Sequence, residues 1–351
     1  MNGTKSFRCI PQGALPYENI KSATHMIAKL FPDIPYLPLL PNIAPNQSLK
    51  KRTLKNMPGI IIGENDDINI DTNVTDIKSI QNHLNKVMKS DSIEDFKSFE
   101  IDDIFFEKFL LLIKKFKSSY ACINLLGPFS VSRLFTELSS HRIFINVNVK
   151  KLYLQTIVAT AAYAILKIKE YSPDTTPIII FEEPTLAMLG MIKHDNEAIT
   201  VDSVIDLLAS VFSKIKERGA LVCVKCLGKC DWSIPIKAGA DIISYDAYNN
   251  PNNLCIIPDV ITDYLNAGGK INWGIIPVIS ENMIMRLNNH YVYDRLKATI
   301  DGVSVSGVPS DLLYRSASIS INGDVNNLPL IFAEKVAMLT KNVSSRLTVS
   351  G

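Results

Sequence analysis

Two adjacent carboxylates follow a short apolar run, where Pro177-Ile-Ile-Ile-Phe181 leads into Glu182-Glu183-Pro184. Because successive side chains of a strand point to opposite faces, one carboxylate should face the interior of the fold and the other its wall. An inward carboxylate can hold a substrate amine or act as a general acid or base, with its pKa raised by desolvation. A structural carboxylate that pairs with a neighbouring strand or caps a helix fits the same spacing. Glu182 and Glu183 are therefore candidate catalytic residues, with the structural interpretation left open.

Three cysteines lie within eight residues, in Cys223-Val-Lys-Cys226-Leu-Gly-Lys-Cys230. Thiolates at short spacing are typical zinc ligands, but a closed zinc site takes four of them. Cys223 falls inside an apolar run, where we expect it to pack as a small buried residue. Cys226 and Cys230 alone do not complete a metal site. Lys225 shares the face of Cys223, and we expect its ammonium to point inward as a candidate catalytic group.

Asp246 ends another β-like run, Asp241-Ile-Ile-Ser-Tyr-Asp246. Asp246 is a further candidate catalytic residue, because an acid one strand along from Lys225 can pair with it, as a structural ion pair or as part of a metal or substrate site. Trp273 lies in the next run, Lys270-Ile-Asn-Trp-Gly-Ile-Ile276, and is expected in the core or in a pocket wall.

Short apolar runs alternate with longer helical stretches from residue 59 onward, which is the pattern of parallel βα units. The runs are almost continuously apolar, so both faces of the sheet should be buried. With a short strand near residues 8–12, the chain supplies the strands of an α/β fold, a single (β/α)₈ TIM barrel spanning residues 1–351. The other expected strands are 59–63, 120–126, 177–181, 220–225, 240–245, 270–276 and 316–321.

Around this barrel we expect an N-terminal elaboration and a helical insertion at about residues 71–117, polar and charged, with an amphipathic run at 105–116. Residues 152–168 are apolar but short for a membrane span and flanked by lysines, so we expect a buried helix there. A helix over 202–218 should end at Gly219. In a barrel of this type, chemistry gathers at the C-terminal ends of the strands, where all the candidates above are placed.

Composition narrows the possible partners. Hydrophobic residues make up 47% of the 351 residues, enough for a large core and too many for a disordered chain. The 37 basic and 35 acidic residues nearly cancel and form no basic run, so neither nucleic acid nor an anionic membrane is expected as a partner. An N-terminus without a signal-like apolar segment and six cysteines without a disulfide pattern predict a cytoplasmic protein. The partner that we expect is a small molecule.

Several segments, taken together, resemble the barrel superfamily shared by the catalytic half of cobalamin-independent methionine synthase and by uroporphyrinogen decarboxylase. The similarity is greatest to the short methionine-synthase-like proteins, and the matching segments run nearly from end to end in the same order. They are Gly13-Ala-Leu-Pro-Tyr17, residues 31–41, Gly127-Pro-Phe-Ser130, Glu182-Glu-Pro-Thr-Leu-Ala187, Cys226-Leu-Gly-Lys-Cys-Asp-Trp232, Asp241-Ile-Ile-Ser-Tyr-Asp-Ala-Tyr248 and Trp273-Gly-Ile-Ile-Pro277.

The resemblance implies zinc chemistry. In the family, a His-x-Cys pair, a carboxylate on the next strand and a Cys on the last strand hold zinc, which binds a thiol such as homocysteine. The metal lowers the pKa of the thiol, and the thiolate attacks a methyl donor. The matching positions here are Lys225, Leu227, Asp246 and Asn322. Since a lysine ammonium has no lone pair for a metal and an amide is a poor zinc ligand, the zinc site is largely lost.

No cofactor is therefore expected. We expect the Lys225 ammonium to fill the place of the ion, while Cys226, Cys230 and Asp246 are the residues that can rebuild a partial zinc site. The resemblance also makes Glu182 the acid that holds a substrate amine, and it places Tyr17 where the family has a histidine. The residues assigned to substrate binding are Tyr17, Asp231, Trp232, Trp273 and Asn322.

These observations predict a methionine-synthase-like methyltransferase acting on a small thiol or amino acid, with a degenerate zinc site. The alternative is a non-catalytic barrel that binds a small anionic ligand or a partner protein, with Lys225 and Asp246 as a structural ion pair. Decarboxylation in the manner of uroporphyrinogen decarboxylase ranks last, because the N-terminal motif has no arginine near it beyond Arg8.

Overall fold

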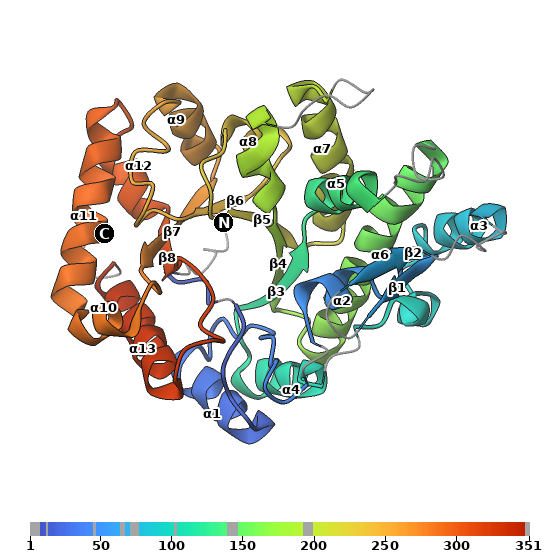
Figure 1. Cartoon of the computed structure of the whole chain (residues 1–351), viewed down its shortest axis with the longest axis horizontal. Helices are drawn as coiled ribbons and strands as arrows, with labels where there is room; N and C mark the ends of the chain where they lie inside the picture. The colour runs from blue at the N-terminus through green and yellow to red at the C-terminus, as the bar shows by residue number, and fades with distance from the viewer. Residues whose placement is uncertain are drawn as a thin grey trace.

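The computed structural model describes residues 8–11, 13–44, 47–63, 67–70, 77–101, 104–138, 147–191 and 199–347. Six parallel strands form one curved sheet in chain order, with helices around its outer side (Figure 1). The strands are β3 (Tyr120–Leu126), β4 (Thr176–Glu182), β5 (Leu221–Cys226), β6 (Ile242–Tyr245), β7 (Lys270–Ile276) and β8 (Ala317–Ile321). These six match the expected strands to within a residue or two.

Two short segments extend the parallel pairing beyond both edges of this sheet. One follows Arg8 and pairs with β8, since the amide of Ile10 donates to the carbonyl of Ile319 at 3.1 Å. The other precedes Pro38 and pairs with β3 through the amide of Leu37. The segments also meet each other. The bridged residues are Cys9 with Ile319, Tyr36 with Cys122 and Ala14 with Leu39. Of the strand expected at residues 8–12, Gln12 lies outside the described residues.

The expected strand at 59–63 is not part of the main sheet. Residues Ile60–Ile62 form β1, which pairs antiparallel with β2 (Ile68–Ile70) in a separate two-stranded ribbon. The middle residue, Ile61, is 56% exposed, so this run alternates in burial instead of being covered on both faces. The prediction that this run joins the main sheet was wrong. Three isoleucines between glycines are compatible with a buried strand of the main sheet and also with a strand of a separate ribbon.

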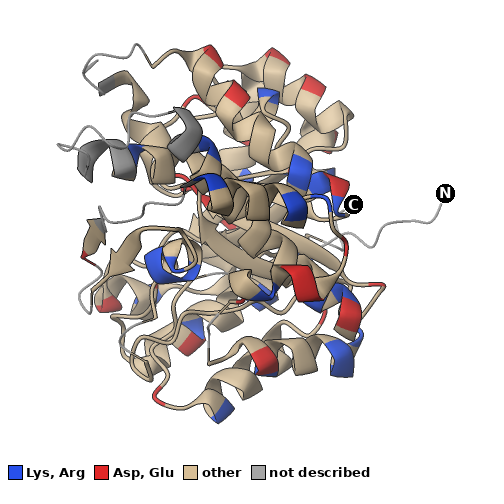
Figure 2. Ribbon diagram, turned by 90° about the vertical axis from the view of Figure 1, so that its right-hand side faces the viewer, with Lys and Arg blue, Asp and Glu red and all other residues tan. Residues whose placement is uncertain are grey.

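Helices cover the outer face of the sheet. The longest, α6 (Val147–Tyr171), contains the expected buried helix at 152–168. Among the described residues, no helix is long and apolar enough to cross a membrane. Along the helices seen in Figure 2, basic and acidic residues are intermixed instead of separated by sign. The other helices are α1 (Ile20–Leu30), α2 (Leu49–Leu54), α5 (Pro128–Leu138), η3 (Pro184–Met191), α7 (Val201–Glu217), α8 (Ser233–Lys237), α9 (Pro258–Asn266), α10 (Glu281–Arg286), α11 (Asn289–Val305), α12 (Ser310–Arg315) and α13 (Leu330–Arg346).

The predicted insertion is helical. It contains α3 (Ile77–Val87), the 3₁₀ helix η1 (Ile93–Phe99) and α4 (Phe106–Phe116), and all of these pack against α6. Residues 71–76 and 102–103 of this segment lie outside the described residues. The amphipathic run at 105–116 is confirmed as α4, whose apolar face is buried.

Strand alternation separates the side chains that face the helices from those that face the concave interior. Phe181 stacks on Phe212 of α7 with ring centroids 5.7 Å apart, so it faces outward, and its neighbour Glu182 faces inward. The register pairs Glu182 with Lys225, Lys225 with Ser244 and Ser244 with Asn272, and these residues therefore share the inner face.

Candidate functional site

A buried ion pair stands at the C-terminal ends of two neighbouring strands. Glu182 is the last residue of β4 and Lys225 lies near the end of β5. The Lys225 Nζ is 3.3 Å from Glu182 Oε1. The lysine side chain is 2% exposed and the glutamate 22%, so the carboxylate is the part of the ion pair that solvent can reach. Asn124 of β3 donates its Nδ2 to the same Oε1 at 2.6 Å and fixes the orientation of the acid.

The charge of Lys225 is maintained by its neighbours. Burial alone lowers its pKa, but the carboxylates of Glu182 and Asp324 raise the pKa above the ordinary value. Asp324 follows β8 and accepts from the amide of Ala14 at 3.4 Å. Its Oδ1 lies 2.7 Å from where a Cβ on Gly13 would stand, and Gly13 has φ +100°, so only glycine suits this approach.

Asp246 lies beyond the end of β6 and has partners of its own. Asn322 Nδ2 donates to its Oδ1 at 3.1 Å, and the amide and side chain of Asn249 donate at 3.0 and 2.6 Å. Asn322 in turn accepts from the amide of Val278 at 3.0 Å. The expected Lys225–Asp246 ion pair is not formed. Lys225 pairs in register with Glu182 and Ser244, whereas Asp246 comes two residues after Ser244, past the end of β6.

We call these six residues the edge cluster. It consists of a group around Lys225, with Asn124, Glu182 and Asp324, and of the hydrogen-bonded pair Asp246 and Asn322. It contains one ammonium, three carboxylates and two amides, near the C-terminal ends of the strands or in the segments that follow them. Its members are Asn124, Glu182, Lys225, Asp246, Asn322 and Asp324.

Glu183 points the other way, as alternation predicted. It is fully buried and accepts hydrogen bonds from the amides of Phe129 and Ser130 and from Ser130 Oγ, at 2.7–2.8 Å. These donors belong to the first turn of α5, so Glu183 acts as a helix cap, which is the structural alternative left open for it. Burial raises its pKa to about 7, although the three hydrogen bonds oppose the shift.

The two tryptophans assigned to substrate binding lie on the helix side of the sheet. Trp273 follows the inward-facing Asn272, so it faces outward, and its ring lies 5.6 Å from that of Tyr245. The ring of Trp232 also lies near Tyr245, with the ring centroids 6.0 Å apart. Both tryptophans are fully buried, so these side chains form part of the wall and do not reach the edge cluster.

The remaining substrate-binding candidates are engaged in local structure. Asp231 accepts from the amide of Ser233 at 2.9 Å, at the start of α8. Tyr17 is buried and donates its hydroxyl to Glu334 of α13 at 2.9 Å. Of the five residues assigned to substrate binding, only Asn322 belongs to the edge cluster.

The thiols of Cys226 and Cys230 are separated from the edge cluster. Cys226 follows the inward Lys225 and so faces the wall, where its thiol contacts the Gly228 carbonyl at 3.7 Å. A hydrogen bond from the Cys230 thiol lowers the pKa of Cys226. Within the described ranges, no three His, Cys, Asp or Glu residues are placed to hold a metal ion. The donor set at the positions implied by the resemblance does not fit zinc either. Lys225 is paired with Glu182, Leu227 has no ligand atom, and Asn322 donates to Asp246.

Asn124 and Asp324 were not singled out in the sequence. Asn124 is a polar residue in the otherwise apolar run Tyr120–Leu126, which is the signal that could have found it. Asp324 comes just after the last strand, where a barrel places functional groups, but one acid in a polar loop carries no distinctive pattern.

Comparisons of the chain with protein-family models and with curated protein sequences find no match. The ligand that the edge cluster can bind is therefore inferred from the residues of the cluster. Carboxylates outnumber the ammonium, and the most exposed group of the ion pair is an acid, so a cationic or zwitterionic ligand suits the cluster better than an anion.

Proposed function

We propose that this chain is a closed (β/α)₈ barrel of the methionine-synthase-like type that binds a small amine-bearing molecule, such as an amino acid, at its edge cluster without zinc. The observation that carries the proposal is the buried Lys225–Glu182 ion pair at the C-terminal edge. A fixed positive charge in the inner face, surrounded by carboxylates and amides, is suited to a ligand with an ammonium and a carboxylate or thiolate.

Closure of the barrel is supported by the two segments that pair beyond the sheet edges. The bridge at Cys9 lies against β8 and the bridge at Tyr36 lies against β3, both parallel to the strand they meet. Their mutual contact through Ala14 and Leu39 supplies the remaining link in the ring. A closed ring directs the C-terminal ends of all strands to one opening, which is where this architecture binds its ligands.

The ligand's ammonium would meet Glu182, the more exposed partner of the ion pair, and Asp246. Its acidic end would lie toward Lys225, the cation of the cluster. The alternative ligand is an anion without an ammonium group. Such an anion would meet three carboxylates and only one ammonium in the edge cluster. The edge cluster therefore favours a zwitterion over a simple anion.

We expect homocysteine or methionine to stabilise the protein in a thermal-shift assay, and their analogues without the amino group to do so less. At about a hundred times Kd the gain should be about 2–3 kcal/mol. Both Glu182→Gln and Lys225→Met should remove the effect. Lys214→Met, at a side chain that is 50% exposed on α7, is the matched control and should retain it.

Metal analysis of protein purified without chelators is the companion measurement. We expect zinc well below one per chain, and stoichiometric zinc would contradict the assignment of the ion's place to Lys225. An equal thermal shift with and without the amino group would reject the proposed ligand chemistry.

Methyl transfer to a small thiol is a second candidate, favoured by the charge of Lys225. A buried ammonium lowers the pKa of an adjacent thiol and so increases the thiolate that can attack a methyl group. In such a step the thiol proton leaves to solvent and the sulfur–carbon bond forms. The bond between the methyl carbon and the nitrogen of a methylated folate breaks, and that nitrogen keeps the electron pair and takes up a proton. Formation of methionine from homocysteine and a methylated folate, abolished by Lys225→Met, would separate this activity from binding alone.

A further inference from the structure

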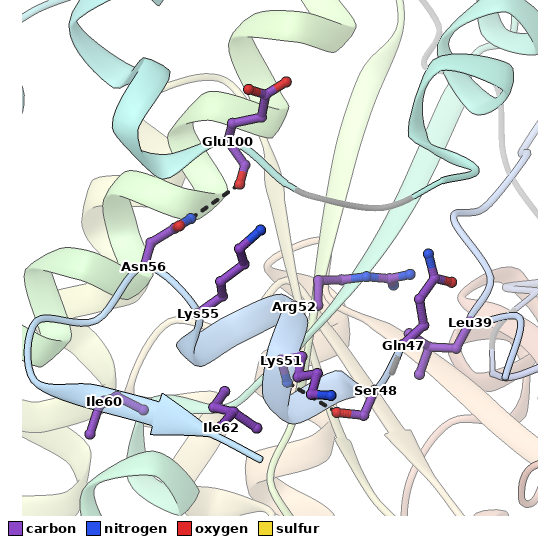
Figure 3. Close-up of a pocket in the computed structure, with 10 residues that line it drawn as sticks. All are labelled: Leu39, Gln47, Ser48, Lys51, Arg52, Lys55, Asn56, Ile60, Ile62 and Glu100. Atoms are coloured by element: carbon purple, nitrogen blue, oxygen red, sulfur yellow. Dashed lines mark hydrogen bonds between the residues drawn. The ribbon is translucent and has the colours of Figure 1, made fainter. Parts of the chain in front are cut away.

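A second, basic pocket lies away from the edge cluster. It has a volume of about 280 Å³, close to the lower end of the range for small-molecule sites, which is about 300–1,000 Å³. The pocket lies between α2, the ribbon strand β1 and the end of η1 (Figure 3). Its lining residues are Leu39, Gln47, Ser48, Lys51, Arg52, Lys55, Asn56, Ile60, Ile62 and Glu100.

The wall formed by α2 is held rigidly. Thr53 is fully buried, and its hydroxyl accepts from the amide of Leu126 at the end of β3 at 2.7 Å. Arg52 is 8% exposed and donates to the carbonyls of Leu37 and Pro38 at 3.0 and 2.9 Å. These bonds fix the helix that presents the pocket's lysines, so the site needs little reorganisation to bind.

The described lining carries more basic than acidic side chains. Lys51 of α2 and Lys55, directly after the end of α2, are four residues apart, and both line the pocket. Among the described residues of the lining, Glu100 is the single acid, and it turns its main-chain carbonyl to Asn56 and its carboxylate to the other side (Figure 3). Among the described residues, no carboxylate is within 4 Å of the Lys51 ammonium.

The opposite wall is apolar. Ile60 and Ile62 line the pocket while Ile61, between them, is exposed on the other face of the ribbon. Gln47 accepts from the amide of Leu40 at 3.4 Å through its carbonyl oxygen, which leaves its NH₂ group to donate. The pocket thus combines cations, an amide donor and apolar side chains.

We propose that this pocket binds a small organic anion, a carboxylate or a phosphate ester, with Lys51 and Lys55 holding the anionic group and the isoleucines of β1 contacting its apolar part. The ammonium groups supply charge-assisted hydrogen bonds, which are the strongest that a protein offers to such a group. This site is separate from the edge cluster in both residues and charge.

Calorimetric titration with benzoate and with phenyl phosphate tests the proposal, and the two probes distinguish a carboxylate from a phosphate. We expect saturable binding of at least one of them, weakened about tenfold or more by the double change Lys51→Gln and Lys55→Gln. Lys50→Gln, on the same helix but outside the pocket lining, is the matched control and should bind as the unaltered protein does.

Binding of neither probe, or equal binding by the double variant, overturns the proposal. Equal binding of the neutral analogue phenol would also overturn it, and that comparison needs no variant. Since binding to a charged site weakens with salt, a salt-independent affinity would count against it as well. Lys225→Met should leave probe binding unchanged, which separates failure here from failure of the proposed function.

Discussion

At the scale of single residues, adjacent side chains have opposite roles. Glu182 and Glu183 are neighbours, yet one pairs with Lys225 inside the fold and the other caps α5 in the wall. Alternation along a strand predicted this division from the sequence. It did not predict the partner of Lys225, because alternation gives the face of a side chain but not its level along the strand.

Glu183 should make stability depend on pH. Its pKa is about 7 in the folded protein against 4.5 ordinarily, so the folded state binds the extra proton between these values. The associated stability is present below pH 4.5 and is lost as the pH rises through about 7. The loss should be about 3 kcal/mol.

Urea unfolding of the unaltered protein and of Glu183→Gln, across this pH range, measures the effect. The variant does not titrate, so the difference in unfolding free energy between the two should change with pH. Glu217→Gln, at a side chain that is 60% exposed, controls for general effects of pH. A difference that stays constant with pH would mean that the hydrogen bonds from Phe129 and Ser130 keep Glu183 ionised throughout.

At the scale of elements, the sequence predicted strands well where they are buried on both faces. Residues 120–126 and 270–276 match β3 and β7 to the residue, because an unbroken apolar run has few other places in a fold. The bridging segment around Tyr36 was missed. It lies between Pro35 and Pro38, and prolines are poor strand residues, so nothing in its composition indicates pairing.

The contact between β4 and α5 depends on a glycine. A Cβ added to Gly127 would lie 2.2 Å from Glu183 Cδ, so Gly127→Ala must displace the carboxylate that caps α5. We expect it to lower the unfolding free energy by about 2 kcal/mol or more, measured by urea denaturation.

Gly302→Ala is the control for that change. Gly302 lies within α11 with nothing within 4 Å of an added Cβ, so alanine there should stabilise by up to about 1 kcal/mol. Equal effects of the two substitutions would show that the close approach of Gly127 to Glu183 is unimportant.

At the scale of the whole molecule, the sheet edges decide whether the barrel is a closed ring. Exposed edges leave main-chain groups unpaired and prone to pair with other chains. The sequence predicted a barrel from the alternation of strands and helices, and the six central strands agree. It could not show how the ends meet, because that depends on isolated bridges of one residue pair each.

Hydrogen exchange tests the closure. The amide of Ile10 donates to Ile319 and the amide of Leu37 to Cys122, at 3.1 and 3.0 Å. If the ring is closed in solution, both amides should exchange about as slowly as those in the central strands β5 and β6. Exchange as fast as in exposed loops would show that the N-terminal segments detach and that the sheet ends at β3 and β8.

The paired tryptophans have a practical consequence for spectroscopy. The chain has two tryptophans, and both are fully buried next to Tyr245, in the layer between the sheet and the helices. Their fluorescence should be blue-shifted in the native protein and move to longer wavelength when this layer takes up water. A small molecule that binds on the concave side does not contact that layer. The wavelength of maximal tryptophan emission should therefore report whether the layer is packed, and it should not change when a ligand binds.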